Sequence, residues 1–157
     1  MSGNEDDFAV CARYRRFVEA LSPADPVRLF VRNGPSLHDA RPDWAVFDRS
    51  TGELRLVVVA GDAQRGYCEV ELRYSGAIVD RENVLRQALV SRTSEILQNE
   101  FAWAGGRLSH GFVLSPARAR ARRGTRLPEF RVAFDRFAYA VSPLPEKRLS
   151  VPPSQGV

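Results

Sequence analysis

The chain has 157 residues, of which 44% are hydrophobic and 27% are charged. This balance is that of an ordinary globular protein, which argues against general disorder, and the length suggests a single domain. No run approaches the roughly 18 apolar residues that a membrane-spanning helix needs, and the acidic start MSGNEDDF does not resemble a secretory signal. We therefore expect a cytoplasmic protein that does not bind a membrane.

Arginine dominates the basic residues. The net charge is +4, the isoelectric point is about 9.6, and all but one of the 23 basic residues are arginine, because Lys147 is the single lysine. Arginine is the better side chain for bidentate contacts to phosphate and carboxylate groups. A GC-rich genome also enriches arginine, but it does not explain why five arginines fall within the nine residues 118–126.

Cysteine and histidine do not predict a metal site. Cys11 and Cys68 are far apart and lie in apolar patterns, so we expect two reduced thiols in the core. A redox or nucleophilic role is the alternative. His38 and His110 have no zinc-binding spacing. We expect neither a metal nor another cofactor.

The first predicted element is an amphipathic helix from Asn4 to Leu21. Asn4 can cap this helix, acidic residues follow in its first turn, and apolar residues recur at spacings of three and four. Ser22 and Pro23 would end it. The apolar run Val27–Val31 predicts a short strand.

Three strands are predicted to follow as an antiparallel meander. Residues 44–47 and 54–59 flank the turn sequence DRSTGE, in which Gly52 can take a positive φ. The second run is apolar on both faces, so we expect it at the centre of the sheet. In the third strand, residues 68–74, apolar and charged side chains alternate, which predicts one buried and one solvated face.

The second half is predicted to contain helices and then a hairpin. Asp80 caps a predicted helix, and a second short helix is predicted from Thr93 to Phe101. Alternation in residues 108–114 and 130–134 predicts two paired strands. Apolar positions change from even to odd at Asp135, which predicts a β-bulge.

These elements predict an α+β fold. In a single domain, residues 1–143, an antiparallel sheet made of the three-strand meander and a C-terminal hairpin would pack on the N-terminal helix and one or two central helices. The Pro-rich segment 144–157 is predicted to be an extended or disordered tail. This order and size resemble small bacterial secretion chaperones and toxin-neutralising immunity proteins. The resemblance, which no motif carries, implies a compact binder without a cofactor and transfers no residue roles.

The connection of the predicted hairpin carries the sharpest functional signal. No carboxylate occurs between Glu100 and Glu129, and this interval holds five clustered arginines. They are Arg118, Arg120, Arg122, Arg123 and Arg126. Such a loop could meet an acidic protein or the phosphates of a nucleic acid, and it could equally be a solvated loop with no specific role.

Candidate catalytic residues are weaker. His110 shares its alternation with apolar residues, which favours a hydrogen-bonded core or edge histidine. Several carboxylates lie near the meander: Asp43, Asp48, Asp62, Glu69 and Glu71. A nuclease of the restriction type needs an acid-x-lysine pair, and Glu69-Val-Glu71 lacks that lysine, so a charged outer sheet face is favoured. Nucleotide-binding, hydrolase-elbow and zinc-protease motifs are absent from the sequence.

We therefore expect a non-catalytic interaction protein that binds an acidic protein partner through the arginine loop and a sheet face. Trp44 and Trp103 are candidate interface anchors, because aromatic residues and arginine are enriched at such sites. The alternative is a nucleic-acid-binding accessory factor that uses the same loop. A third reading is a small enzyme with His110 and the Glu69/Glu71 strand at its site. The sequence does not predict an oligomeric state.

Overall fold

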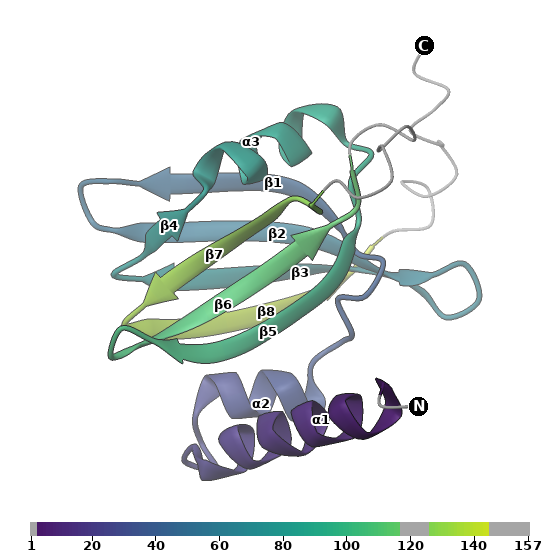
Figure 1. The fold of residues 1–157 in the computed structure, drawn as a ribbon. Helices are drawn as coiled ribbons and strands as arrows, with labels where there is room; N and C mark the ends of the chain where they lie inside the picture. Colours follow the sequence, from purple (N-terminus) through teal and green to yellow (C-terminus); the bar gives the residue numbers. More distant parts are fainter. Residues whose placement is uncertain (1–2, 117–125, 145–157) are drawn as a thin grey trace. The chain divides into compact units, whose positions relative to one another are not determined.

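The computed structural model describes residues 3–116 and 126–144, with only the backbone described for residues 3–10. In this part of the chain, three helices and eight strands follow one another in the order α1–α2–β1–β2–β3–β4–α3–β5–β6–β7–β8 (Figure 1). The fold is α+β with antiparallel strands, as the sequence predicts. The chain divides into two compact units, Met1–Gly34 and Pro35–Val157. The domain boundary at residue 143 stays a prediction, and the tail that follows Leu144 lies outside the described residues.

The first unit contains two helices. α1 spans Gly3–Ala20 and confirms the predicted N-terminal helix. Arg28 links the two helices, because its Nη1 donates hydrogen bonds to the carbonyl oxygens of Glu19 at 3.2 Å and Leu21 at 2.9 Å. Cys11 is exposed on α1, so the prediction of a core thiol is wrong at this position. No helix in the described ranges combines the length and apolar character that crossing a bilayer requires.

The second helix, α2, spans Pro26–Asn33 and replaces the predicted strand. Asp25 caps it, since its Oδ1 accepts a hydrogen bond from the Val27 N–H at 2.9 Å. Pro26 occupies the first turn, where a missing N–H is tolerated. Val27 and Phe30 are three residues apart and both are buried, so the apolar run follows helical spacing.

Four strands in the second unit form sheet A. Their order is β1 (Arg41–Asp48), β2 (Glu53–Asp62), β3 (Gly66–Ser75) and β8 (Arg136–Pro143). The meander β1–β2–β3 is confirmed, with β2 inside the sheet and Gly52 at a φ of 72° in the first turn. Alternate residues of β3, including Val70 and Leu72, are fully buried, while Arg73 on the opposite face is exposed.

The other four strands form sheet B. Their order is β4 (Ile78–Asp80), β7 (Glu129–Phe134), β6 (Arg107–Leu114) and β5 (Ile96–Ala104). β6 and β7 confirm the predicted basic hairpin. The short helix predicted over residues 93–101 is wrong, because β5 pairs along its length with β6 across a turn in which Gly105 and Gly106 have positive φ.

The central helix, α3, spans Glu82–Ser91. Its cap position is held by Arg81, with a φ of 60°, rather than by the predicted Asp80, which ends β4. Leu85 and Ala88 are its buried residues, as the predicted apolar face requires. Glu82 in its first turn forms an ion pair at 2.8 Å with Arg49 in the turn after β1, so α3 lies beside that end of sheet A (Figure 1).

The apolar positions change from even to odd at Asp135 because the chain crosses there from sheet B to sheet A. β7 ends at Phe134 in sheet B and β8 begins at Arg136 in sheet A, so the prediction of a β-bulge is wrong. Asp135 donates its N–H to the Ser75 carbonyl oxygen at 2.9 Å, and its carboxylate pairs with Arg107 at 2.9 Å. The antiparallel strands are thus divided between two sheets.

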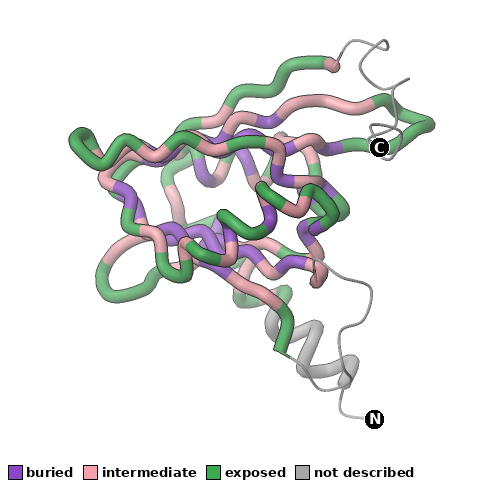
Figure 2. The backbone as a smooth tube through the Cα atoms, turned by 90° about the horizontal axis from the view of Figure 1, so that it is seen from above, coloured by how far each residue is buried: buried purple, intermediate pink, exposed green. Residues whose placement is uncertain are grey.

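The core of the second unit lies between its two sheets. Buried segments gather in the middle of this unit, whereas the turns are exposed (Figure 2). The ring centroid of Phe134 in sheet B lies 5.5 Å from that of Tyr74 and 5.9 Å from that of Phe137, which both belong to sheet A. Such aromatic pairs add stability beyond the area that they bury. On β7, the residues that project outward from sheet B are therefore the odd-numbered ones, which include Arg131.

Candidate functional site

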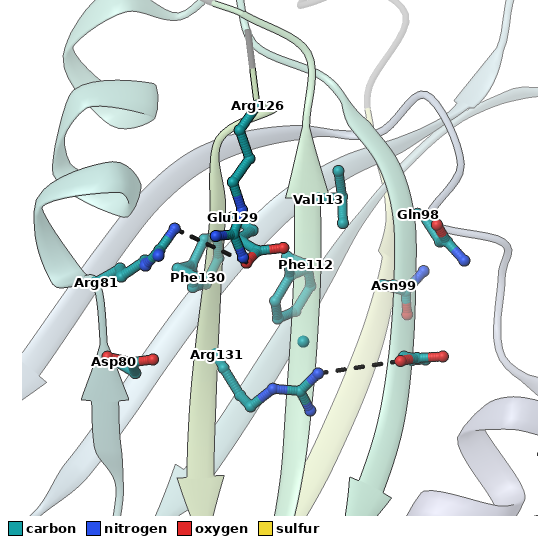
Figure 3. A pocket seen from close by; sticks show the side chains of 12 residues that line it. Asp80, Arg81, Gln98, Asn99, Phe112, Val113, Arg126, Glu129, Phe130 and Arg131 are labelled. Atoms are coloured by element: carbon teal, nitrogen blue, oxygen red, sulfur yellow. Dashed lines mark hydrogen bonds and ion pairs between the residues drawn. The ribbon is translucent and has the colours of Figure 1, made fainter. Parts of the chain in front are cut away.

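A polar pocket of about 310 Å³ opens on the outer face of sheet B (Figure 3). The strand register places four residues in one row across this sheet: Asp80 of β4, Arg131 of β7, Gly111 of β6 and Glu100 of β5. Residues directly opposite in antiparallel strands project to the same face. Their sequence neighbours Phe130 and Phe112 are buried, which assigns the row to the outside.

Arg131 lies across the backbone of Gly111. A Cβ atom at Gly111 would stand only 2.6 Å from Nη2 of Arg131, so the guanidinium occupies the space that a side chain would fill. Arg131 Nη1 donates a hydrogen bond at 2.8 Å to Oγ of Ser109, a fully buried residue. Among the described residues, the nearest carboxylate oxygen, on Glu100, is 4.0 Å from Nη2. The register and one hydrogen bond therefore position this guanidinium, which is in ion-pair range of a carboxylate without a hydrogen bond to it.

A second charged group stands at the end of the pocket where β7 begins. Arg126 and Arg81 both reach toward the Glu129 carboxylate (Figure 3). Arg126 donates a short hydrogen bond to Oε1 of Glu129, and Nη1 of Arg81 is 3.8 Å from the same oxygen. Because the side chain of Glu129 is more than one third exposed, these ion pairs contribute little free energy, and a charged ligand group can replace one of the partners.

The predicted arginine loop joins the two strands that form the centre of this pocket. Of its five arginines, the described residues include Arg126, which lines the pocket and pairs with Glu129. The other four lie outside the described residues: Arg118, Arg120, Arg122 and Arg123. The described ends of the connection follow Leu114 and precede Glu129, so the connection starts and ends beside the pocket.

The two tryptophans belong to different sheets. Trp44 lies on β1 in sheet A, where the Arg55 guanidinium is 5.6 Å from its ring centre, and it is 37% exposed. Trp103 lies near the end of β5 in sheet B, opposite Leu108, and it is 59% exposed. Both keep enough exposed surface to contact a partner, but neither lines the charged pocket.

His110 is buried between the sheets, as its alternation predicts. Its Nδ1 is 2.7 Å from the Tyr74 hydroxyl and its Nε2 is 2.8 Å from Oδ1 of Asn99. Because an amide oxygen only accepts, Nε2 carries the proton and Nδ1 accepts from Tyr74. Burial, and secondarily the charge of Arg131, lowers the pKa of His110 well below 6.5. The ring is therefore neutral and engaged on both nitrogens.

The carboxylates of the meander have structural partners. Glu71 accepts hydrogen bonds from Arg55 at 2.6 Å and Arg73 at 3.2 Å, and the bond from Arg55 lowers its pKa below 4.5. Asp48 and Asp62 accept backbone N–H groups in the turns that follow their strands. Burial raises the pKa of the partly buried Cys68 above 9.0, which opposes a nucleophilic role. The described residues contain no His, Cys, Asp or Glu cluster that could hold a metal ion.

Sequence reasoning missed Arg81, Gly111 and Arg131. The alternation of residues 108–114 and 130–134 already places Gly111 and Arg131 on the face opposite the apolar residues. The missing information was the pairing of β6 with β7, which sets Gly111 directly opposite Arg131.

The sequence matches no protein-family model and no curated protein, and the fold matches no solved structure. Function is therefore inferred from the geometry of the site.

Proposed function

We propose that this protein is a non-catalytic interaction protein of the cytoplasm that binds an acidic protein partner through the arginine-rich connection between β6 and β7 and the outer face of sheet B. The observation that carries the proposal is that Arg126, in this connection, lines the same pocket as Arg81 and Arg131. Basic side chains from a helix cap, a strand and a connection thus meet at one place. Arginines grouped in this way can pair with carboxylates on the surface of an acidic partner.

The pattern of charge favours a protein over a nucleic acid. Three carboxylates, on Asp80, Glu100 and Glu129, alternate with the arginines around the pocket. A continuous phosphate backbone would approach these carboxylates at unfavourable distances, whereas a protein surface can present both signs. Stacking of bases needs accessible rings, and the rings nearest the pocket, Phe112 and Phe130, are only 1% and 3% exposed.

The contacts of His110 are those of a core residue and not those of a general base. A general base must reach its substrate with a pKa near the working pH. The imidazole of His110 is fully buried, and both of its nitrogens are hydrogen-bonded to Tyr74 and Asn99. The most conspicuous candidate for catalysis therefore supports the core between the two sheets.

Affinity capture from a lysate of the native host tests the proposal. The loop-serine variant changes Arg118, Arg120, Arg122, Arg123 and Arg126 to serine. A control with the same net charge changes five exposed arginines elsewhere to serine: Arg13, Arg15, Arg16, Arg65 and Arg136. We expect mass spectrometry to find an acidic protein with the wild type and the control and to lose it with the loop-serine variant. Equal recovery with both variants would remove the loop from the binding mechanism.

The nucleic-acid alternative has its own observation, the absence of any carboxylate between Glu100 and Glu129 in the sequence. Fluorescence anisotropy with short DNA and RNA at rising salt decides it. Phosphate-dominated binding weakens linearly on a log–log scale as salt increases. We expect weak binding that the loop-serine variant and the charge-matched control reduce alike. Tight binding that only the loop-serine variant abolishes would favour the nucleic-acid function.

A further inference from the structure

We propose that the pocket on the outer face of sheet B holds one carboxylate side chain of the partner on the guanidinium of Arg131, and that Gly111 makes the seat for this contact. The inference rests on the proposed function and specifies its central contact. It assigns this contact to Arg131, which is a residue of strand β7, and not to the arginines of the β6–β7 connection.

The first support is the way Arg131 is held. Its side chain is 36% exposed, and its Nη1 is fixed at 2.8 Å from Oγ of the buried Ser109. The Ser109 hydroxyl in turn lies 3.3 Å from the carbonyl oxygen of Ala102 on β5. A guanidinium carries five N–H donors, and among the described residues its hydrogen bonds are to Ser109 alone. The remaining donors can face the pocket without an internal competitor at hydrogen-bond distance.

The second support is the space that Gly111 leaves for the guanidinium of Arg131. A methyl group at position 111 would meet Nη2 of Arg131 at 2.6 Å, Cζ at 2.8 Å and Nη1 at 3.2 Å. All three atoms belong to the guanidinium, so Gly111 is the position that allows this group to lie against β6. A side chain positioned before binding loses less conformational entropy when the partner arrives.

The third support is the ligand chemistry that the surroundings allow. A carboxylate is planar, carries a single charge and matches the fork of a guanidinium with two parallel hydrogen bonds. A phosphate carries more charge, and Glu100 already lies 4.0 Å from Nη2 of Arg131. Asp80 stands on the other side of Arg131 in the same cross-strand row. Two flanking carboxylates therefore favour a singly charged ligand group, with a basic group of the partner beside it.

Nuclear magnetic resonance titration of the full chain tests this contact. The probes are glutamate blocked at both ends as N-acetyl-glutamate N-methylamide, the matching glutamine compound, and inorganic phosphate. With blocked glutamate we expect saturable shifts at amides of residues 109–113 and 129–131 and at Nε of Arg131. Blocked glutamine should give no saturable shift, and phosphate should bind more weakly than glutamate.

Three variants make the test specific. Arg131→Gln should abolish the saturable shifts, and Gly111→Ala should weaken them at least about tenfold by displacing the guanidinium. Arg136→Gln removes an exposed arginine from sheet A and should leave them unchanged. Shifts that persist in Arg131→Gln, no saturable response to glutamate, or tighter binding of phosphate would each overturn the inference.

The same variants separate this inference from the proposed function. Retention of the captured partner by Arg131→Gln, together with its loss from the loop-serine variant, would contradict the Arg131 contact and leave the proposed function standing. Retention by the loop-serine variant would contradict the proposed function, while the probe titration would still decide whether Arg131 binds a carboxylate.

Discussion

Gly111 and Arg131 form a cross-strand pair in which the missing side chain of one residue is the space for the guanidinium of the other. Arg131 Nη2 lies 2.6 Å from where a Cβ atom of residue 111 would stand. Glycine is normally unfavourable inside a strand, because it loses more conformational freedom than other residues and has no side chain to pack. At position 111 it leaves the space in which the guanidinium of Arg131 lies against the backbone of β6.

Replacing Gly111 with alanine should change the site without disrupting the fold. The backbone at residue 111 is not in the positive-φ region, and the added methyl group meets the end of a flexible side chain. We expect the free energy of unfolding in urea to change by less than about 1 kcal/mol, because better strand propensity offsets the lost hydrogen bond to Ser109. A loss above about 2 kcal/mol would mean that the pair is part of the core.

The burial of His110 predicts a pH dependence of stability. Its folded-state pKa is lowered well below 6.5, so the unfolded chain binds the proton first as the pH falls. The contribution of His110 to the free energy of unfolding is therefore complete above pH 6.5. It is lost as the pH decreases below this value, at up to about 1.4 kcal/mol per pH unit. Glu71 and Glu82 have pKa values lowered from 4.5, so their contributions are lost at lower pH.

Denaturant unfolding between neutral pH and about pH 5 checks this expectation. His110→Gln should cost about 1–3 kcal/mol at neutral pH, because the Tyr74 hydroxyl loses its acceptor. The difference between the wild type and the variant should then shrink as the pH falls. Parallel stability profiles for the two proteins would show that His110 does not titrate on unfolding.

Two glycines with similar backbone conformations should respond differently to alanine. Gly76, between β3 and β4, and Gly105, in the β5–β6 turn, have φ values of 64° and 60°. A Cβ at Gly76 would overlap the Asp135 carboxylate, whereas Gly105 faces open space. Both substitutions should cost about 1–2 kcal/mol for the left-handed conformation. Gly76→Ala should cost at least about 1 kcal/mol more in thermal or urea unfolding, because of this overlap. Equal losses would contradict a tight contact at the passage between the sheets.

The cap of α2 is a further test. Asp25→Ala should destabilise this helix by about 1 kcal/mol, whereas Asp25→Asn should be nearly neutral, because asparagine caps equally well. Hydrogen exchange at the Val27 amide, which donates to Asp25 Oδ1 at 2.9 Å, reports the effect directly. Identical exchange in the alanine and asparagine variants would show that the side-chain cap is not important for α2.

Alternation along the strands predicted the meander and the basic hairpin, because one face of each strand is buried and a period of two is then unavoidable. Two short apolar runs were assigned wrongly for opposite reasons. Over residues 27–31, the Asp25–Pro26 start signal outweighs the β-branched composition. Over residues 96–101, a few apolar side chains fit a helix as well as a strand, and pairing with β6 decides the outcome.

The site depends on information that a single sequence does not contain. The connection between β6 and β7 covers residues 115–128, and a connection of that length does not fix the register of the strands that it joins. The alignment of Gly111 with Arg131 therefore appears only when both strands are in place. The parity change at Asp135 is compatible with a bulge or a change of sheet, and the contacts of Asp135 with Ser75 and Arg107 belong to the second arrangement.

The most direct measurement for the central claim is the dissociation constant of the captured partner for the wild type, the loop-serine variant and the charge-matched control. We predict that the loop-serine variant alone raises the Kd at least about tenfold, equivalent to about 1.4 kcal/mol, with unfolding curves that overlay those of the control. The same Kd for all three proteins would contradict the proposal that this arginine surface binds the partner.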